Sequence, residues 1–265
     1  MPHFPILPDL ARAPVPGRVD FVGAGPGDPE LLTLRALKAL GRADVVIHDR
    51  LISPEILELA RRDALVIDAG KEGFGPSTPQ AEINRLIVAH ARAGARVVRL
   101  KSGDPCIFGR LDEEIEAVEA AGLAYRIVPG ISAAAAAAAG IGQSLTRRGR
   151  NGSVRLLTGH DVKGFADHDW RALARPGEVA AIYMAKRAAR FLTGRLMMHG
   201  TAPDTPVTVV ENASRPDERR LATTLAALPG ALAAAALKGP AVILLGLAPR
   251  WAEAALPKVL EEIAL

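Results

Sequence analysis

The sequence has only one cysteine, Cys106, and no long apolar run. A single cysteine excludes an internal disulfide and a metal site built from several cysteines, and it agrees with a reducing compartment. We expect its thiol to be a small buried hydrophobe rather than a reactive group. No run reaches the roughly 18 apolar residues of a membrane span, and the first 17 residues hold five prolines instead of a signal-peptide core. These absences predict a cytoplasmic protein with no membrane partner.

Aromatic residues are also sparse, at 4%, in a chain with a formal charge of +4. An excess of basic over acidic residues favours acidic partners. The one dense basic cluster, at 147–150, lacks the interleaved aromatic residues that would stack on bases. A small polycarboxylate fits at least as well, so we expect no nucleic-acid partner. No second histidine or cysteine stands at metal-ligand spacing from His160, which is most simply a polar residue at a strand end, so we expect no metal.

Apolar periodicity indicates an α/β fold in two parts. In the first part, strands are expected at 18–23, 44–48, 65–68, 96–101 and 125–128, and helices at 29–40, 80–93 and 113–121. This βαβ rhythm predicts a mostly parallel sheet with flanking helices. In the second part, strands are expected at 154–158, 179–183, 206–211, 221–225 and 241–245, and helices at 133–139, 188–199 and 228–238. The alternation there is less regular, which favours a mixed sheet.

We therefore expect a proline-rich N-terminal extension at 1–17, an N-terminal α/β domain at 18–131 and a C-terminal α/β domain at 132–265. Ser132 is a plausible N-cap for the alanine-rich helix that follows it. Ligands in open α/β sheets bind outside the carboxyl ends of the strands. The segment 103–110, which follows the strand at 96–101, is thus the first place to look for a site. Gly103 permits backbone angles, or a close approach of a ligand, that a Cβ would block.

A second glycine-rich loop follows the first strand, and it invites a dinucleotide-binding interpretation. We reject that interpretation because the fingerprint G-x-G-x-x-G requires glycine where this chain has Asp28, and because Pro26 removes a backbone donor. The loop offers a tight turn whose backbone lines a cleft. The alternative is a loop needed only for packing.

Charged residues follow the next strands. Asp49 and Arg50 end the second strand, where an arginine beside a carboxylate suits a general base or carboxylate recognition, although a structural ion pair is the alternative. Lys71 follows the third strand and is either a cation at the cleft or a surface lysine. Arg110 precedes Glu113 by one helical turn; the pair suits carboxylate binding, but Glu113 also suits a helix N-terminus by its charge alone.

Taken in order, these motifs resemble those of the tetrapyrrole (corrin/porphyrin) methylases, and in particular of the members that methylate uroporphyrinogen III. The resemblance extends from about residue 19 to residue 247. Its matching segments are 23–34, 49–51, 70–71, 103–110, 129–132, 183–184, 210–212 and 240–241. The family usually has glycine in place of Ser102 and Ala213, and histidine in place of Arg147. Only about 17 residues precede the first strand, so we expect the stand-alone form rather than a fusion with a dehydrogenase/chelatase domain.

The resemblance implies two α/β domains with S-adenosylmethionine folded between them, in a homodimer. The implied cofactor contacts are Pro26, Ser102, Gly103, Asp104, Ile107, Ser132, Ala133, Met184, Ala213 and Ala241. The implied catalytic residues are Asp49 and Lys71, as acid/base groups, and Arg110. The implied substrate contacts are Arg50, Glu113 and Arg148. By residue type alone, Met184 would be a core residue.

The implied reaction moves two methyl groups from S-adenosylmethionine to C2 and C7 of uroporphyrinogen III and gives precorrin-2, for siroheme, cobalamin or heme d1 synthesis. The eight carboxylates of that substrate would give the arginines a purpose. Two alternatives stay open at this point. One is another activity of the same superfamily, on a later precorrin or on RNA, and the other is a non-catalytic tetrapyrrole-binding module.

Overall fold

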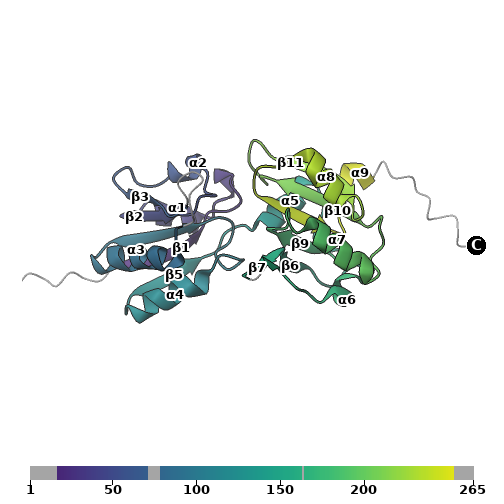
Figure 1. Ribbon diagram of the computed structural model, residues 1–265. Helices are drawn as coiled ribbons and strands as arrows, with labels where there is room; N and C mark the ends of the chain where they lie inside the picture. Colours follow the sequence, from purple (N-terminus) through teal and green to yellow (C-terminus); the bar gives the residue numbers. More distant parts are fainter. Residues whose placement is uncertain (1–16, 71–77, 163, 254–265) are drawn as a thin grey trace, which may run out of the picture.

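The computed structural model describes residues 17–70, 78–162 and 164–253, and the structural statements below concern these residues. Two five-stranded sheets with their helices stand beside each other (Figure 1). The strands of the first sheet lie before Ser132 and those of the second lie after it, while the domain boundaries themselves stay a prediction. The predicted extension at 1–17 lies outside the described residues except for Gly17, and Lys71 also lies outside them.

The first sheet is entirely parallel, with the strand order β3-β2-β4-β1-β5. Its strands are β1 (Arg18–Gly23), β2 (Val45–His48), β3 (Leu65–Asp68), β4 (Arg96–Lys101) and β5 (Ala124–Val128). Helices α1 (Leu34–Leu40), α2 (Pro54–Leu57), α3 (Gln80–Arg92) and α4 (Leu111–Ala120) connect them. The predicted parallel α/β arrangement is confirmed.

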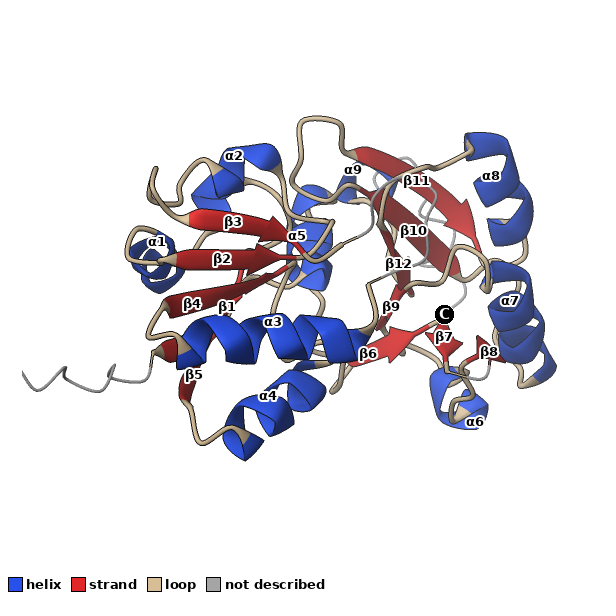
Figure 2. Ribbon diagram, turned by 60° about the vertical axis from the view of Figure 1, so that its left-hand side comes forward, coloured by secondary structure: helices blue, strands red, loops and turns tan. Residues whose placement is uncertain are grey.

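Both faces of this sheet are covered, as a buried parallel sheet requires (Figure 2). Val97 on β4 packs in one apolar cluster with Ile83 and Ile87 of α3. Its neighbour Val98 points to the other face and packs in a second cluster with Leu40 of α1. Because side chains on both faces of β4 pack into an apolar cluster, the strand is buried from its second residue onward.

The predicted helix at 29–40 is wrong in one respect. The segment is a 3₁₀ turn, Pro29–Leu31, followed by a separate helix α1 that begins after Thr33. The Thr33 hydroxyl accepts a hydrogen bond from the backbone N–H of Ala36 at 3.1 Å and caps the new helix. This break shifts the helical phase, so Leu34 is 74% exposed while small alanines and Leu40 face the sheet.

The second sheet is mixed, as predicted, with the order β11-β10-β12-β9-β6. Its strands are β6 (Arg155–Thr158), β9 (Ala180–Tyr183), β10 (Pro206–Glu211), β11 (Arg219–Thr224) and β12 (Ala241–Leu245). Only the β6–β9 pair is parallel among these. A short hairpin, β7 (His160–Asp161) with β8 (Gly164–Phe165), was not predicted.

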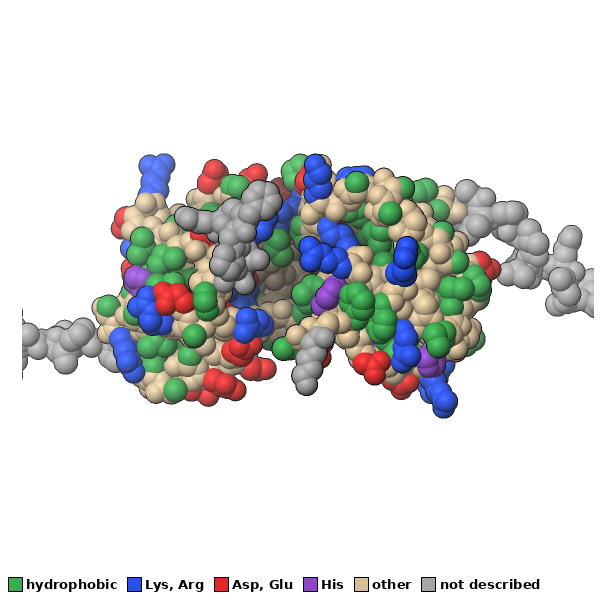
Figure 3. Space-filling model, viewed as in Figure 1, with side chains coloured by type: hydrophobic (Ala, Val, Ile, Leu, Met, Phe, Trp, Pro, Cys, Tyr) green, Lys and Arg blue, Asp and Glu red, His purple; other side chains and the backbone are tan. Residues whose placement is uncertain are grey.

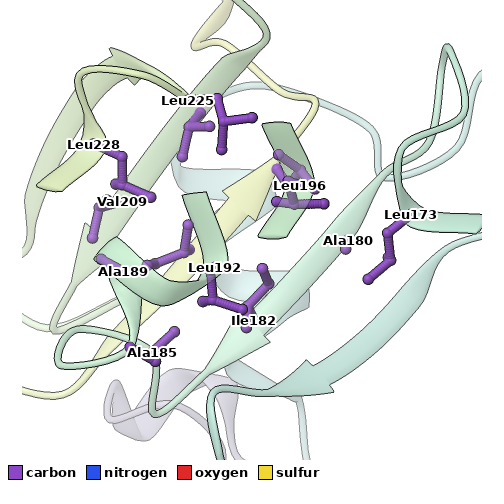
Figure 4. Packing of buried hydrophobic residues seen from close by; sticks show 14 of the residues in the cluster. Leu173, Ala180, Ile182, Ala185, Ala189, Leu192, Leu196, Val209, Leu225 and Leu228 are labelled. Carbon is purple, nitrogen blue, oxygen red and sulfur yellow. The ribbon is translucent and has the colours of Figure 1, made fainter. Parts of the chain in front are cut away.

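Helices cover both faces of the second sheet. Its helices are α5 (Ala133–Gly140), α6 (Trp170–Leu173), α7 (Ala189–Met198), α8 (Leu228–Ala235) and α9 (Arg250–Glu253). Leu192 and Leu196 of α7 pack onto Ile182 and Val209 of the sheet (Figure 4). On the other face, the alanines of α5 let its backbone approach β12 closely, where Ala137 is fully buried. Within the described residues, no helix is long and apolar enough to cross a membrane.

Candidate active site

A cavity of about 510 Å³ lies between the two sheets and is lined by segments from both halves of the chain. The space-filling view shows the corresponding groove between the halves (Figure 3). All ten residues that the sequence analysis placed at a cofactor line this cavity: Pro26, Ser102, Gly103, Asp104, Ile107, Ser132, Ala133, Met184, Ala213 and Ala241. The structure therefore brings together residues that are up to 215 positions apart. Their contact with a cofactor stays a prediction.

The N-terminal wall of the cavity is made of loops whose backbones lie within hydrogen-bond distance of one another. Gly25 and Gly103 exchange two hydrogen bonds between their N–H and C=O groups, at 3.1 and 2.7 Å. A Cβ on Gly130 would lie 2.2 Å from the carbonyl oxygen of Gly103, so a side chain there would force the loops apart. Gly103 itself has a φ of +69°, a left-handed conformation that glycine adopts without strain. The special backbone conformation expected at Gly103 is thus confirmed, while the contact of this backbone with a ligand stays a prediction.

Asp104 ties two of these loops together. Its Oδ1 accepts a hydrogen bond from the backbone N–H of Cys106 at 2.8 Å, and its Oδ2 accepts one from Gly130 at 3.0 Å. Both carboxylate oxygens are thereby engaged in holding the wall. The expectation that Cys106 is buried is wrong, since this turn projects away from the core and leaves the residue exposed.

The C-terminal wall holds Met184 in an unusual backbone conformation. Met184 has a φ of +53° and is 53% exposed, so it is not the core residue that its type suggests. Nδ1 of His160 lies 2.8 Å from the Met184 carbonyl oxygen. The neighbouring Tyr183 hydroxyl accepts a hydrogen bond from the N–H of Ala134 at 3.1 Å, and burial raises the pKa of that hydroxyl. A non-glycine residue held in this region is a feature of functional sites.

Arg215 spans the cavity from the loop after β10. Its guanidinium donates to the carbonyl oxygen of Leu51 and, at 3.5 Å, to that of Pro26. The adjacent Ser214 hydroxyl accepts a hydrogen bond from the N–H of Asp28 at 3.2 Å. These contacts join the loops after β1 and β2 to the opposite lobe.

A buried network of charges supports Asp49 at the end of β2. Arg99 on β4 is 2% exposed and donates to Asp49 and, at 2.9 Å, to Glu114 of α4. Lys101 donates to the other oxygen of Glu114, also at 2.9 Å. The partner of Asp49 among the described residues is therefore Arg99 on the neighbouring strand, and the alternative of an ion pair with the adjacent Arg50 is wrong.

The charges of this network are coupled. Burial alone would lower the pKa of Arg99, but the negative charges of Asp49 and Glu114 outweigh it and raise that pKa. For Lys101, burial together with the positive charge of Arg99 lowers the pKa despite Glu114. Glu114 is completely buried and is shared between two cations, so it is the residue on which the network depends.

The three predicted substrate contacts, Arg50, Glu113 and Arg148, do not line the 510 Å³ cavity. Asp49 and Arg110 do not line it either. Arg110 and Glu113 form the expected fork on the surface, with guanidinium-to-carboxylate distances of 2.7 and 2.6 Å. Arg50 and Arg148 are exposed. Ile107 lies on the cavity wall three residues before Arg110, which places that arginine close to the cavity along the chain.

Comparison with known proteins assigns the family. Residues 18–229 match the model of the tetrapyrrole (corrin/porphyrin) methylases. The chain belongs to this family. Among its curated relatives, a siroheme synthase of Gluconacetobacter diazotrophicus is 48% identical over 238 residues, which are 89% of this chain and 51% of that protein. A siroheme synthase of Nitrosospira multiformis is 47% identical and is likewise covered over 51% of its length. The chain thus spans about half the length of these relatives.

Solved structures of methylases share the fold of this chain. A uroporphyrin-III C-methyltransferase from Thermus thermophilus, complexed with S-adenosyl homocysteine, is 36% identical with a TM-score of 0.74, and the match covers 87% of this chain and 92% of that one. A cobalt precorrin-4 methyltransferase is 28% identical with a TM-score of 0.77, and the match covers 86% and 94%.

Sequence reasoning missed several residues of this methylase site. Arg99, Lys101 and Glu114 were read only as parts of a strand and a helix. Two basic residues on a strand expected to be buried on both faces were the signal, because buried charges need partners. Arg187 and Arg215 on the cavity wall follow no motif of residue type or spacing, and only the fold reveals them.

Proposed function

We propose that this methylase transfers methyl groups from S-adenosylmethionine to C2 and C7 of uroporphyrinogen III and forms precorrin-2. The observation that carries the proposal is the convergence of ten predicted cofactor residues, from both lobes, on one cavity. The likeness to uroporphyrin-III C-methyltransferase structures supports the same activity. A later precorrin as substrate is supported by the cobalt precorrin-4 methyltransferase, but that protein is only 28% identical, against 36% for the uroporphyrin-III enzyme. The alternatives of an RNA substrate or a non-catalytic module have no comparable observation in their favour.

The cavity fits a nucleoside-sized cofactor. Its volume of about 510 Å³ lies within the roughly 300–1,000 Å³ of small-molecule sites. Gly103 lines its N-terminal wall, where the nearest protein atom to an added Cβ would be 3.9 Å away, so its missing side chain leaves space open, and Ile107 and Ala133 add an apolar lining. When bound, S-adenosylmethionine supplies a methyl group that its sulfonium already activates. We propose that the protein mainly aligns the two reactants.

Asp49 is the proposed proton acceptor. Methyl transfer to a ring carbon that already carries a substituent leaves the ring positively charged. The ring becomes neutral again when it loses a proton from another position, and an ionised carboxylate can take that proton. Arg99 fixes the orientation of the Asp49 carboxylate through a hydrogen bond, while Asp49 keeps about a third of its side chain exposed toward solvent. A carboxylate that is anchored on one side and open on the other suits a base that must reach a substrate.

We further propose that the methylase acts as a homodimer in the cytoplasm, as its resemblance to the family implies. Its product would feed siroheme synthesis, which the names of the curated relatives support. Cobalamin and heme d1 are the other end products that the reaction could serve.

Incubation with S-adenosylmethionine and uroporphyrinogen III tests the function. We expect mass analysis of the tetrapyrrole to show the gain of two methyl groups, and Asp49→Asn to lose most of that gain because an amide is a far poorer proton acceptor. Tight binding of both ligands without methyl transfer would instead support the binding module. A strongly salt-dependent RNA affinity would support the RNA alternative.

A second prediction concerns the shared cofactor site. Replacing Met184 with Arg should weaken the affinity for S-adenosylhomocysteine at least tenfold, because a long cation would enter the C-terminal wall of the cavity. Isothermal titration calorimetry measures this affinity. Met198→Arg is the matched control, since Met198 is 77% exposed at the end of α7 and does not line the cavity. Equal affinities of a folded Met184→Arg variant and the wild type would contradict a site shared by both lobes.

A further inference from the structure

We propose that Arg187, on the C-terminal wall of the cavity, binds a carboxylate of the tetrapyrrole substrate. This inference rests on the proposed function and adds a substrate contact that no motif of the sequence indicated. The residues already proposed for the substrate come from other segments, at 50, 110, 113 and 148. Arg187 would extend the recognition of a polycarboxylate to the opposite lobe.

The first observation is the imbalance of charge on the cavity wall. Lys186, Arg187 and Arg215 line the cavity, whereas Asp104 is the one acidic residue among its described lining. Both oxygens of Asp104 already accept backbone hydrogen bonds within the N-terminal wall. In Figure 3, Lys and Arg side chains gather beside the groove on the C-terminal lobe. A wall with this surplus of positive charge favours an anionic ligand.

The second observation distinguishes Arg187 from the other two cations. Nζ of Lys186 donates to the carbonyl oxygens of Leu237 and Gly239, and Arg215 donates to carbonyl oxygens across the cavity. Arg187 has no hydrogen bond or ion pair with any described residue, and its side chain is exposed. The described residues therefore leave the donors of its planar guanidinium unused, and such a fork matches a carboxylate in a bidentate manner.

The third observation is the unfavourable position of Arg187 for helix stability. It immediately precedes Ala188, the N-cap of α7, and that cap provides no side-chain hydrogen bond. Positive charges near a helix N-terminus oppose the macrodipole. Arg190, in the first turn of α7, opposes the macrodipole in the same way, but of the two arginines Arg187 alone lines the cavity, so a ligand there explains its position. Uroporphyrinogen III offers acetate and propionate groups of the required chemistry.

The test compares Arg187→Gln with Arg190→Gln. Arg190 is an exposed arginine three residues further along the chain, in the first turn of α7, and it does not line the cavity. Binding of uroporphyrin III, which carries the same eight carboxylates but needs no turnover to be measured, is followed by its fluorescence. We expect Arg187→Gln to weaken uroporphyrin III binding about tenfold, Arg190→Gln to change it less than twofold, and Arg187→Lys to restore part of the affinity. S-adenosylhomocysteine affinity should be unchanged in all three variants.

Several results would overturn the inference. Equal losses in the Arg187 and Arg190 variants would mean a diffuse charge effect, and a loss of S-adenosylhomocysteine affinity would assign Arg187 to the carboxylate of the cofactor. Unchanged uroporphyrin III binding in Arg187→Gln would remove its role altogether. The proposed function fails separately: a wild-type protein that binds uroporphyrin III through Arg187 but never methylates uroporphyrinogen III would overturn the function and leave the carboxylate contact in place.

Discussion

Replacing Glu114 with Ala is expected to lower the free energy of unfolding by about 3 to 5 kcal/mol, the usual cost of removing one partner from a buried ion pair. Glu114 is 0% exposed and accepts hydrogen bonds from both Arg99 and Lys101. Without it, two buried cations face each other with only Asp49 as a counter-charge. Lys101 can respond by losing its proton, because burial already lowers its pKa, but the guanidinium of Arg99 cannot.

Urea unfolding followed by circular dichroism measures this loss. Glu116→Ala is the control, because Glu116 lies two residues along on the exposed face of α4 and should change stability by less than about 0.5 kcal/mol. A triple variant, Arg99→Met with Lys101→Met and Glu114→Leu, should be more stable than Glu114→Ala, since it removes all three charges together. If Glu114→Ala proved as stable as Glu116→Ala, the network would not be the support that the structure indicates.

The arrangement of strands and helices was predictable because apolar periodicity reports burial directly. The strand predicted at 96–101 is an example: β4 spans Arg96–Lys101, and its Val97, Val98 and Leu100 are buried. The short helices α2, α6 and α9 were missed because four residues complete barely one turn and leave no periodicity to detect. The break before α1 was missed because Thr33 was not recognised as the cap of a second helix.

The candidate site was predictable where its residues lie in the segments at strand ends that carry the family motifs. In the first sheet, the strands that precede these segments converge on one edge of the sheet. The partner of Asp49 was not predictable, because Arg99 lies 50 positions away and meets it only through the pairing of β2 with β4. The sequence did not predict that Arg187 has no partner among the described residues, because this depends on which of the neighbouring cations are hydrogen-bonded to other groups in the fold.

The structure changes how the role of Arg110 should be tested. Arg110 is 58% exposed and forms an i,i+3 fork with Glu113 at the start of α4. An exposed pair of this kind stabilises a protein by about 0 to 1 kcal/mol. A purely structural role would therefore give a small effect on both stability and turnover. A contact with a substrate carboxylate would affect turnover alone.

Arg110→Lys should lower the turnover of uroporphyrinogen III by tens to thousands of fold, because losing one desolvated charge-assisted contact costs on the order of 2 to 5 kcal/mol. Lysine keeps the charge but loses the planar fork that Glu113 holds in place. S-adenosylhomocysteine affinity and the midpoint of thermal unfolding should stay close to those of the wild type. Arg85→Lys is the matched control, since Arg85 forms the same exposed i,i+3 fork with Glu82 on α3. If Arg110→Lys kept wild-type turnover, the Arg110–Glu113 fork would be only a surface ion pair, like that of Arg85. If the variant instead lost cofactor affinity, Arg110 would lie on the cofactor side of the cavity.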